Sequence, residues 1–168
     1  AVLQFRIEKF GLRIRPDVDF QIINPEFDER YRDFWQTYLK MTARKGVTEQ
    51  YAKLEMRRRH TLIGAMLIHK GYADGMICGT FGNNALHLHY VDQVLGKRPG
   101  VNVYAAMNVL ILPERQILLV DTHVNENPTA GQLAEITLLA AEKMRRLGMA
   151  PRVALLSHSN FGSSNSES

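Results

Sequence analysis

The chain has 168 residues, of which 45% are apolar and 23% charged, a composition typical of one globular domain or a piece of one. Lysine and arginine outnumber aspartate and glutamate by 21 to 17, and the resulting net charge of +4 suits an anionic partner without requiring one. No apolar run approaches the roughly 20 residues that a membrane-spanning helix needs, and basic residues cluster only at residues 56–60, which we interpret as a solvated helix face. We therefore expect neither membrane insertion nor nucleic-acid binding.

A single cysteine, Cys78, cannot form an internal disulfide, which indicates a reducing compartment and a cytoplasmic protein. The first predicted element is an amphipathic helix over residues 2–10, broken at Gly11. Because this helix pattern begins without an initiating methionine, we expect the chain to start inside a longer protein. Residues 18–25 then read as a strand ended by Asn-Pro.

Three helices are predicted next. Aromatic and apolar residues recur at helical spacing over residues 26–41, and Thr48 opens a further helical stretch. Residues 61–71 are helical and apolar nearly all round, which predicts burial on more than one side.

The second half of the chain alternates strands and helices. A short strand at residues 73–79 precedes a helix at residues 84–95, and two apolar strands at residues 101–113 and 116–124 are expected to be covered on both faces. Thr129 and Gln132 have the spacing of a capping box at the start of a long helix that Gly148 ends, and a last strand follows at residues 152–157. Strands that alternate with helices of this length predict an α/β fold of three layers, α/β/α, around a largely parallel sheet.

Polar groups follow three of these strands, at residues 79–84, 121–129 and 157–166. Ligands of such sheets bind beyond the carboxyl ends of the strands, so these segments are where a site is expected. The last segment has five serines and two asparagines around Gly162, a composition that can cradle a phosphate or that can be a solvated tail. Neither of the two common glycine-rich nucleotide motifs occurs in the chain.

Four segments in succession carry a family resemblance. "KGVT", "ADGMICG", "NPTAGQLAEI" and "PRVALLSHSNFGS" resemble the ordered signatures of the phosphate acetyl/butyryltransferase family, and they extend from Lys45 to Ser163. "RIRPDVDFQIINP", "FWQTY", "ICGTFG" and "YVDQVLG" resemble one subgroup in particular, the C-terminal phosphotransacetylase-like domain of hybrid bacterial malic enzymes. The resemblance implies an isocitrate/isopropylmalate dehydrogenase-like fold of the phosphotransacetylase type, with residues 1–168 forming an incomplete domain.

The resemblance also implies a set of ligand-binding residues for an acyl-CoA or a phosphate. The family binds the anion with arginines, one of them in a "TT....RP" pattern that here becomes Asn83, Asn84, His89 and Tyr90, so an imidazole replaces a guanidinium. Arg44 is the nearest match to a second family arginine, beside Lys45 of the "KG.T" turn. The loop that the family turns toward its coenzyme cleft matches Ser157, Ser159, Asn160, Gly162 and Ser163. The family's catalytic serine, arginine and aspartate belong to a later segment with no match among these residues, so no catalytic residue is predicted here.

Three functions remain open on this basis. The first is a regulatory domain that senses acetyl-CoA and builds a homo-oligomer, covalently linked to a malic-enzyme part that decarboxylates malate with NADP and a divalent metal; this chain itself would hold no cofactor. The second is an active phosphate acetyltransferase, against which His89 in place of an arginine argues. The third is a structural dimerisation module without a ligand.

Other chemically suggestive residues have simpler interpretations. His87 and His89 would point about 200° apart on a helix, which does not suit a shared zinc ion. Cys78 is expected to be a small core residue rather than a nucleophile, and His123 a surface residue of a turn. Asp121 and Glu126 are interpreted as capping or solvated carboxylates rather than an acid/base pair.

Overall fold

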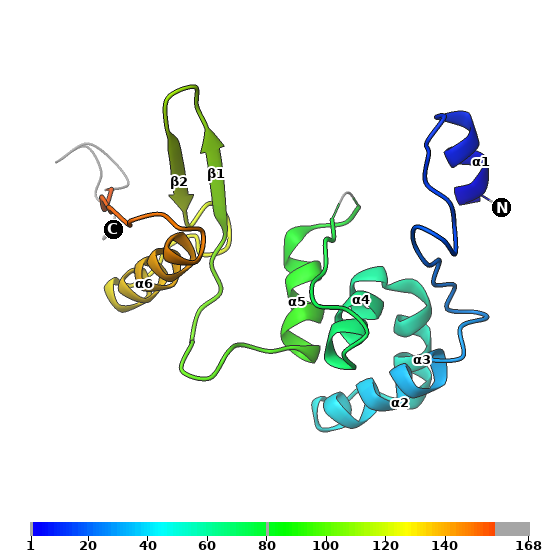
Figure 1. Cartoon of the computed structure of the whole chain (residues 1–168). Helices are drawn as coiled ribbons and strands as arrows, with labels where there is room; N and C mark the ends of the chain where they lie inside the picture. The colour runs from blue at the N-terminus through cyan, green and yellow to red at the C-terminus, as the bar shows by residue number, and fades with distance from the viewer. Residues whose placement is uncertain (1, 80, 157–168) are drawn as a thin grey trace. The chain divides into compact units, whose positions relative to one another are not determined.

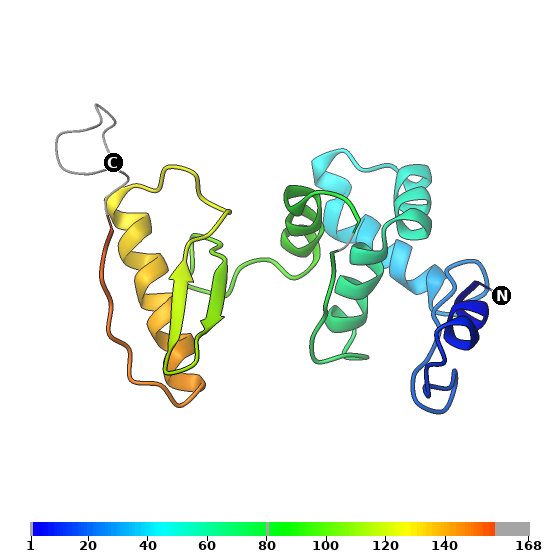
Figure 2. The ribbon, with the colours of Figure 1, turned by 90° about the horizontal axis from the view of Figure 1, so that it is seen from above.

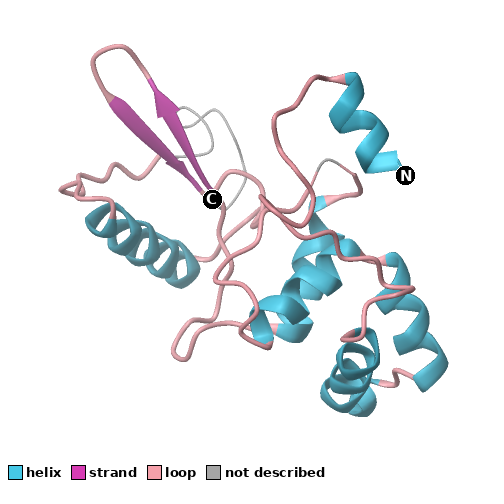
Figure 3. Ribbon diagram, turned by 45° about the vertical axis from the view of Figure 1, so that its right-hand side comes forward, coloured by secondary structure: helices cyan, strands magenta, loops and turns pink. Residues whose placement is uncertain are grey.

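A computed structural model describes residues 2–79 and 81–156 of the chain (Figure 1). They form two compact units, which divide between Leu95 and Gly96. The first unit is helical and the second combines a β-hairpin with one long helix, as the colours of Figure 3 show.

Five α-helices make up the described part of the first unit. All five were predicted, and the structure gives their bounds as α1 Val2–Lys9, α2 Tyr31–Thr42, α3 Glu49–Arg58, α4 His60–His69 and α5 Asn84–Val94. Thr48 caps α3 by accepting a hydrogen bond from the backbone N–H of Tyr51 at 3.3 Å, and a short 3-10 turn, η1 (Ala43–Lys45), precedes it.

One hydrophobic cluster joins α2, α3, α4 and α5. Its members are buried aromatic and aliphatic side chains, among them Phe34, Trp35, Tyr38, Met56, Leu62, Met66, Tyr90 and Val94. Helix α4 contributes five buried residues within one ten-residue element, which confirms the expectation that it is covered on more than one side. The first unit therefore has a core of its own, built mainly from helix faces.

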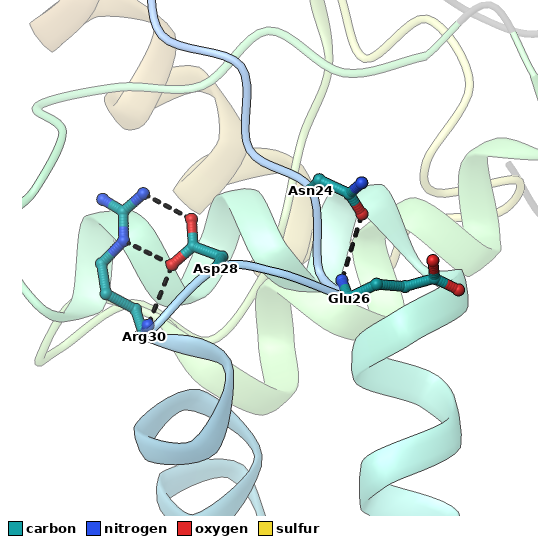
Figure 4. Close-up of polar contacts among 4 residues, drawn as sticks. All are labelled: Asn24, Glu26, Asp28 and Arg30. Atoms are coloured by element: carbon teal, nitrogen blue, oxygen red, sulfur yellow. Dashed lines mark hydrogen bonds and ion pairs between the residues drawn. The ribbon is translucent and has the colours of Figure 1, made fainter. Parts of the chain in front are cut away.

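The segment before α2 forms turns and not the strand predicted for residues 18–25. Asn24 Oδ1 accepts a hydrogen bond from the backbone N–H of Glu26 at 3.1 Å, and Asp28 Oδ1 accepts one from the backbone N–H of Arg30 at 2.9 Å (Figure 4). Such side-chain turns satisfy backbone donors locally, and among the described residues the only pairing here is an isolated bridge between Pro16 and Phe20. For the same reason α2 begins at Tyr31 and not near residue 26.

The predicted strand at residues 73–79 is also wrong, because no strand pairs with this segment within the described part of the chain. Cys78 is consequently exposed and not a core residue. The segment instead packs its Met76 against α4 at Gly64, where an added Cβ would collide with the Met76 sulfur. Glycine at this position leaves room for the Met76 side chain against the helix.

In the second unit, strands β1 (Met107–Ile111) and β2 (Gln116–Val120) pair antiparallel in a hairpin, with Met107 opposite Val120 and Ile111 opposite Gln116. The described residues thus contain an antiparallel pair where a largely parallel sheet was predicted. The hairpin lies beside α6 (Ala130–Arg146) in Figures 1 and 2. Four of the five β1 residues are exposed. The expectation that both faces of these strands are covered is therefore wrong.

Helix α6 begins as predicted. Thr129 Oγ1 accepts from the backbone N–H of Gln132, and Gln132 Oε1 accepts from the backbone N–H of Thr129, which completes a capping box. Gly148 at φ +77° follows its C-terminal end. A strand was predicted at residues 152–157, of which residues 152–156 are described, and these form no strand in the described structure. None of the described helices combines the length and the apolar character needed to cross a bilayer.

Candidate functional site

A cavity of about 450 Å³ opens in the first unit where α4 and α5 begin. We call it the α4–α5 pocket. Its polar lining residues are Arg58, Arg59, His60, Thr61, His87 and Tyr90, and its apolar ones include Met76, Ile77, Phe81 and Leu86. Basic groups thus line one part of the pocket and apolar side chains another.

Two helix N-termini contribute to this pocket. Arg59 has an extended backbone, with φ −107° and ψ 95°, and it separates the end of α3 from the start of α4. Asn83 is the N-cap of helix α5, and its Oδ1 accepts a hydrogen bond from the backbone N–H of Leu86 at 2.8 Å. Because the N-terminal end of a helix carries partial positive charge, both helices favour a negatively charged group in the pocket.

Arg59 is anchored by a buried carboxylate. Its Nε donates to Glu55 Oε2 at 3.2 Å, and the hydroxyl of Tyr90 donates to the same oxygen. Glu55 is only 4% exposed. Burial and the contact with Glu55 raise the pKa of Tyr90 well above its ordinary value, and the charge of Glu55 raises the pKa of Arg59, so the phenol and the guanidinium both keep their protons at neutral pH.

His87 ties the loop before α5 to α4. Its Nδ1 lies 2.6 Å from Thr61 Oγ1, and its Nε2 lies 3.0 Å from the carbonyl oxygen of Phe81. Since a carbonyl oxygen only accepts, Nε2 must carry a hydrogen, and in the neutral ring the Thr61 hydroxyl then donates to Nδ1. This assignment follows from the partners of the ring, and it makes His87 a link that holds Phe81 at the pocket rim.

The residues predicted on α5 lie close to this pocket with different surroundings. Asn83 is the helix cap described above, and Asn84, the first residue of α5, is exposed. His89 is exposed and contacts the ring of Tyr90 edge-on, with centroids 5.4 Å apart. The α5 histidine that lines the pocket is His87, and a ligand-binding role of His89 stays a prediction.

The other predicted residues are not brought to this pocket among the residues described. Arg44 and Lys45 form the exposed end of η1, which turns at Gly46 with φ +82°. Ser157, Ser159, Asn160, Gly162 and Ser163 lie outside the described residues. Their roles likewise stay predictions.

Sequence reasoning missed Arg58 and Arg59, because a basic run at the end of an amphipathic helix looks like a solvated face. Their position directly before a helix that is apolar nearly all round could have identified these arginines as pocket residues. A buried helix must start at the wall of a core, so residues at its N-terminus are well placed to line a pocket.

A second cavity of about 490 Å³ lies beside the turns before α2, with Asp28, Glu29, Arg30 and Tyr72 in its lining. The positive charge in its lining, on Arg30, is already paired with Asp28. Arg30 donates to Asp28 at 2.9 Å and 2.7 Å, which lowers the pKa of that carboxyl, and its guanidinium lies 5.2 Å from the centre of the Tyr72 ring (Figure 4 shows the Asp28 contacts). This cavity is therefore less suited to an anion than the α4–α5 pocket.

In the second unit, Asp121 organises the turn after β2. Its carboxylate accepts hydrogen bonds from the backbone N–H groups of Ala106, His123, Val124 and Asn125. Burial raises the pKa of Asp121 and these hydrogen bonds outweigh it, so the net pKa is lowered. Asp121 is thus a capping carboxylate, as interpreted from the sequence, and His123 is exposed in the turn. No group of three or more His, Cys, Asp or Glu side chains gathers as metal ligands would in the part of the chain that the structure describes.

The chain is similar to proteins of two kinds. The profile of the phosphate acetyl/butaryl transferase family matches residues 2–168. A NADP-dependent malic enzyme of Salmonella typhimurium is 49% identical over 166 residues, which are 99% of this chain and 22% of that protein. A phosphate acetyltransferase of Nitratidesulfovibrio vulgaris is 35% identical over 159 residues, which are 94% of this chain and 22% of that protein.

Solved structures agree with this relationship. A phosphotransacetylase of Streptococcus pyogenes superposes with a TM-score of 0.80 at 27% identity, over 98% of this chain and 49% of that one. The chain therefore has the α/β fold of the phosphotransacetylases, although it spans only about half of the solved chain and about a fifth of the curated relatives it matches. This chain belongs to the phosphate acetyl/butaryl transferase family.

Proposed function

We propose that this chain is an acyl-CoA-binding regulatory part of a malic enzyme, with acetyl-CoA as its effector. The observation that carries the proposal is the α4–α5 pocket, in which two arginines and two helix N-termini meet an apolar wall. The basic side suits the phosphate groups of a coenzyme, and Met76, Ile77 and Phe81 suit an acyl chain or the arm that carries it.

The likeness to malic enzymes gives the proposal its direction. A relative at 49% identity, matched over 22% of its length, carries the name of a NADP-dependent malic enzyme. Under the proposal, the oxidative decarboxylation of malate with NADP and a divalent metal takes place in a separate part of the protein that is covalently linked to this chain. The chain itself binds the effector and contributes to a homo-oligomer, and it catalyses no step of that reaction.

Calorimetry on the full-length protein that carries this chain tests the proposal. Acetyl-CoA should bind with measurable heat and should stabilise the protein by about 2.7 kcal/mol at a ligand concentration 100 times the dissociation constant. Malic-enzyme activity should change over the same concentration range. If millimolar acetyl-CoA gives neither heat nor a rise in melting temperature, the sensor function is overturned and a purely structural dimerisation module takes its place.

An active phosphate acetyltransferase is the second candidate, and one observation favours it. Although His89 occupies the position where the family resemblance expects an arginine, Arg58 and Arg59 supply guanidinium groups to the pocket from a different helix end. Formation of acetyl phosphate from acetyl-CoA and phosphate by the full-length protein would support this candidate. Its absence, together with acetyl-CoA binding, would favour regulation.

A further inference from the structure

Glu55 is an unusual residue for a helical core. It is 4% exposed on α3, within a unit whose other core members are almost all apolar. Taking a carboxylate out of water costs several kcal/mol unless charged or hydrogen-bonding partners compensate. Here both partners, Arg59 and Tyr90, donate to the same oxygen, Oε2.

This arrangement is not needed for packing alone. Apolar side chains of similar volume commonly replace a buried ion pair at no loss of stability. What the carboxylate provides that an apolar group does not is a fixed direction for the guanidinium. Arg59 is also tied at its backbone, since its N–H donates to the Glu55 carbonyl at 2.9 Å and its carbonyl accepts from the N–H of Ile63 at 3.1 Å.

The anchored guanidinium still has donors to offer. Glu55 engages Nε of Arg59, and the two terminal nitrogens make no hydrogen bond that is evident among the described residues. Arg59 is 42% exposed at its side chain and lines the α4–α5 pocket. A planar guanidinium held at one edge can present its remaining N–H groups to a phosphate as a fork.

Arg57 and Arg58 are different. Arg57 is exposed and its guanidinium lies 5.3 Å from the centre of the Tyr31 ring, away from the residues that line the pocket. Arg58 lines the pocket but is exposed and lacks an anchoring carboxylate in the described structure. Among the three consecutive arginines, only Arg59 is both at the pocket and held in place.

We propose that Glu55 is a positioning residue of the α4–α5 pocket: together with Tyr90 it fixes the Arg59 guanidinium so that it binds a phosphate group of the ligand. The inference rests on the proposed function, because it needs an anionic ligand in this pocket. The phosphate can belong to a coenzyme A derivative or can be inorganic phosphate, and binding measurements with each probe distinguish these two sources.

The test measures binding of acetyl-CoA, coenzyme A and inorganic phosphate to the full-length protein by calorimetry, alongside the melting temperature of the protein.

Arg59→Lys keeps the positive charge and loses the paired N–H donors of the guanidinium, and it should weaken binding about tenfold or more. Glu55→Gln keeps the size of the side chain and removes the negative charge that holds the Arg59 guanidinium. Tyr90→Phe removes the hydroxyl that donates to Glu55. Both should weaken binding several-fold without a matching loss of melting temperature. Arg57→Gln removes a charge from the same helix end outside the pocket and should leave binding unchanged.

The outcomes distinguish a positioning role of Glu55 from a purely structural one. If Glu55→Gln lowers the melting temperature but the folded variant binds acetyl-CoA and phosphate as the parent does, Glu55 is only structural and the inference is overturned. Should Glu55→Gln fail to fold, Arg59→Lys and Tyr90→Phe decide, and parental affinity in both would overturn the inference. Weakened binding of coenzyme A alone assigns the phosphate to the coenzyme, and weakened binding of inorganic phosphate as well assigns a site for any phosphate. If the unaltered protein binds none of the three probes, the proposed function itself fails.

Discussion

At the scale of single residues, Asp121 shows how one carboxylate can organise a turn. It accepts from four backbone N–H groups and also from Asn125 Nδ2, which in turn donates to the carbonyl of Tyr104 at 2.7 Å. The residues before β1 and after β2 are thereby joined through one side chain. A neutral side chain of the same shape would present a donor where these backbone donors need an acceptor.

We expect Asp121→Asn to destabilise the second unit by about 1–3 kcal/mol, because partly buried N–H groups lose their acceptor. Hydrogen exchange should be faster at the amides of Ala106 and Asn125, whose N–H groups the carboxylate accepts. Glu114→Gln, an exposed change in the turn between β1 and β2, is the matched control and should have no effect. Unchanged exchange at both amides in the Asp121 variant would contradict this role.

The lowered pKa of Asp121 gives the same site a pH dependence. A carboxylate whose pKa is lower in the folded state stabilises the fold above the unfolded-state pKa of about 3.9 and loses that contribution as the pH falls through the folded-state pKa. The difference in unfolding free energy between the parent and Asp121→Asn should therefore be constant near neutral pH and narrow below about pH 4. A difference that grows on acidification would be inconsistent with this assignment.

At the scale of elements, α6 is defined by its first turn. The reciprocal bonds between Thr129 and Gln132 satisfy two backbone donors that the helix cannot satisfy itself. Gly131, in the same turn, has ordinary helical φ and nothing within 4 Å of where a Cβ would stand. The two positions thus test opposite effects within one turn of the helix.

We expect Thr129→Ala to lower the free energy of unfolding by about 1 kcal/mol, through loss of the cap. Gly131→Ala, the control, should raise it by about 0.5–1 kcal/mol, because alanine costs less backbone entropy in a helix. Denaturant unfolding followed by the helical circular dichroism signal measures both. A Thr129→Ala variant as stable as the parent would show that the cap contributes nothing measurable.

At the scale of the whole molecule, the second unit leaves a run of apolar residues near its C-terminal end uncovered. Val153, Leu155 and Leu156 are 56%, 66% and 84% exposed after α6. Exposed apolar segments of this kind are normally covered by other protein surface. The solved phosphotransacetylase of Streptococcus pyogenes is matched over 49% of its chain, so a protein of that length has further chain to cover them.

We therefore expect the amides of residues 153–155 to exchange rapidly in the 168-residue chain and at least about 100-fold more slowly in a full-length protein that carries it, where partner strands can accept or donate. Hydrogen exchange followed by mass spectrometry measures this. Amides in the middle of α6, such as those near Ile136, should be protected to a similar degree in both. Equal exchange of residues 153–155 in the two proteins would contradict the expectation.

The sequence by itself determined the helices, the caps at Thr48 and Thr129, and the family. Thr48, Thr129 and the aromatic spacing in α2 act through hydrogen bonds and contacts within a few residues, so local patterns predict them well. The strands predicted at residues 18–25, 73–79 and 152–157 could not be judged in this way, because a strand exists only if another segment pairs with it. Only the tertiary structure decided that His87 and not His89 lines the pocket, and that Arg59 meets Glu55 and Tyr90 there. The walls of the α4–α5 pocket come from residues as far apart in the sequence as Arg58 and Tyr90. The packing of α3, α4 and α5 brings these residues together.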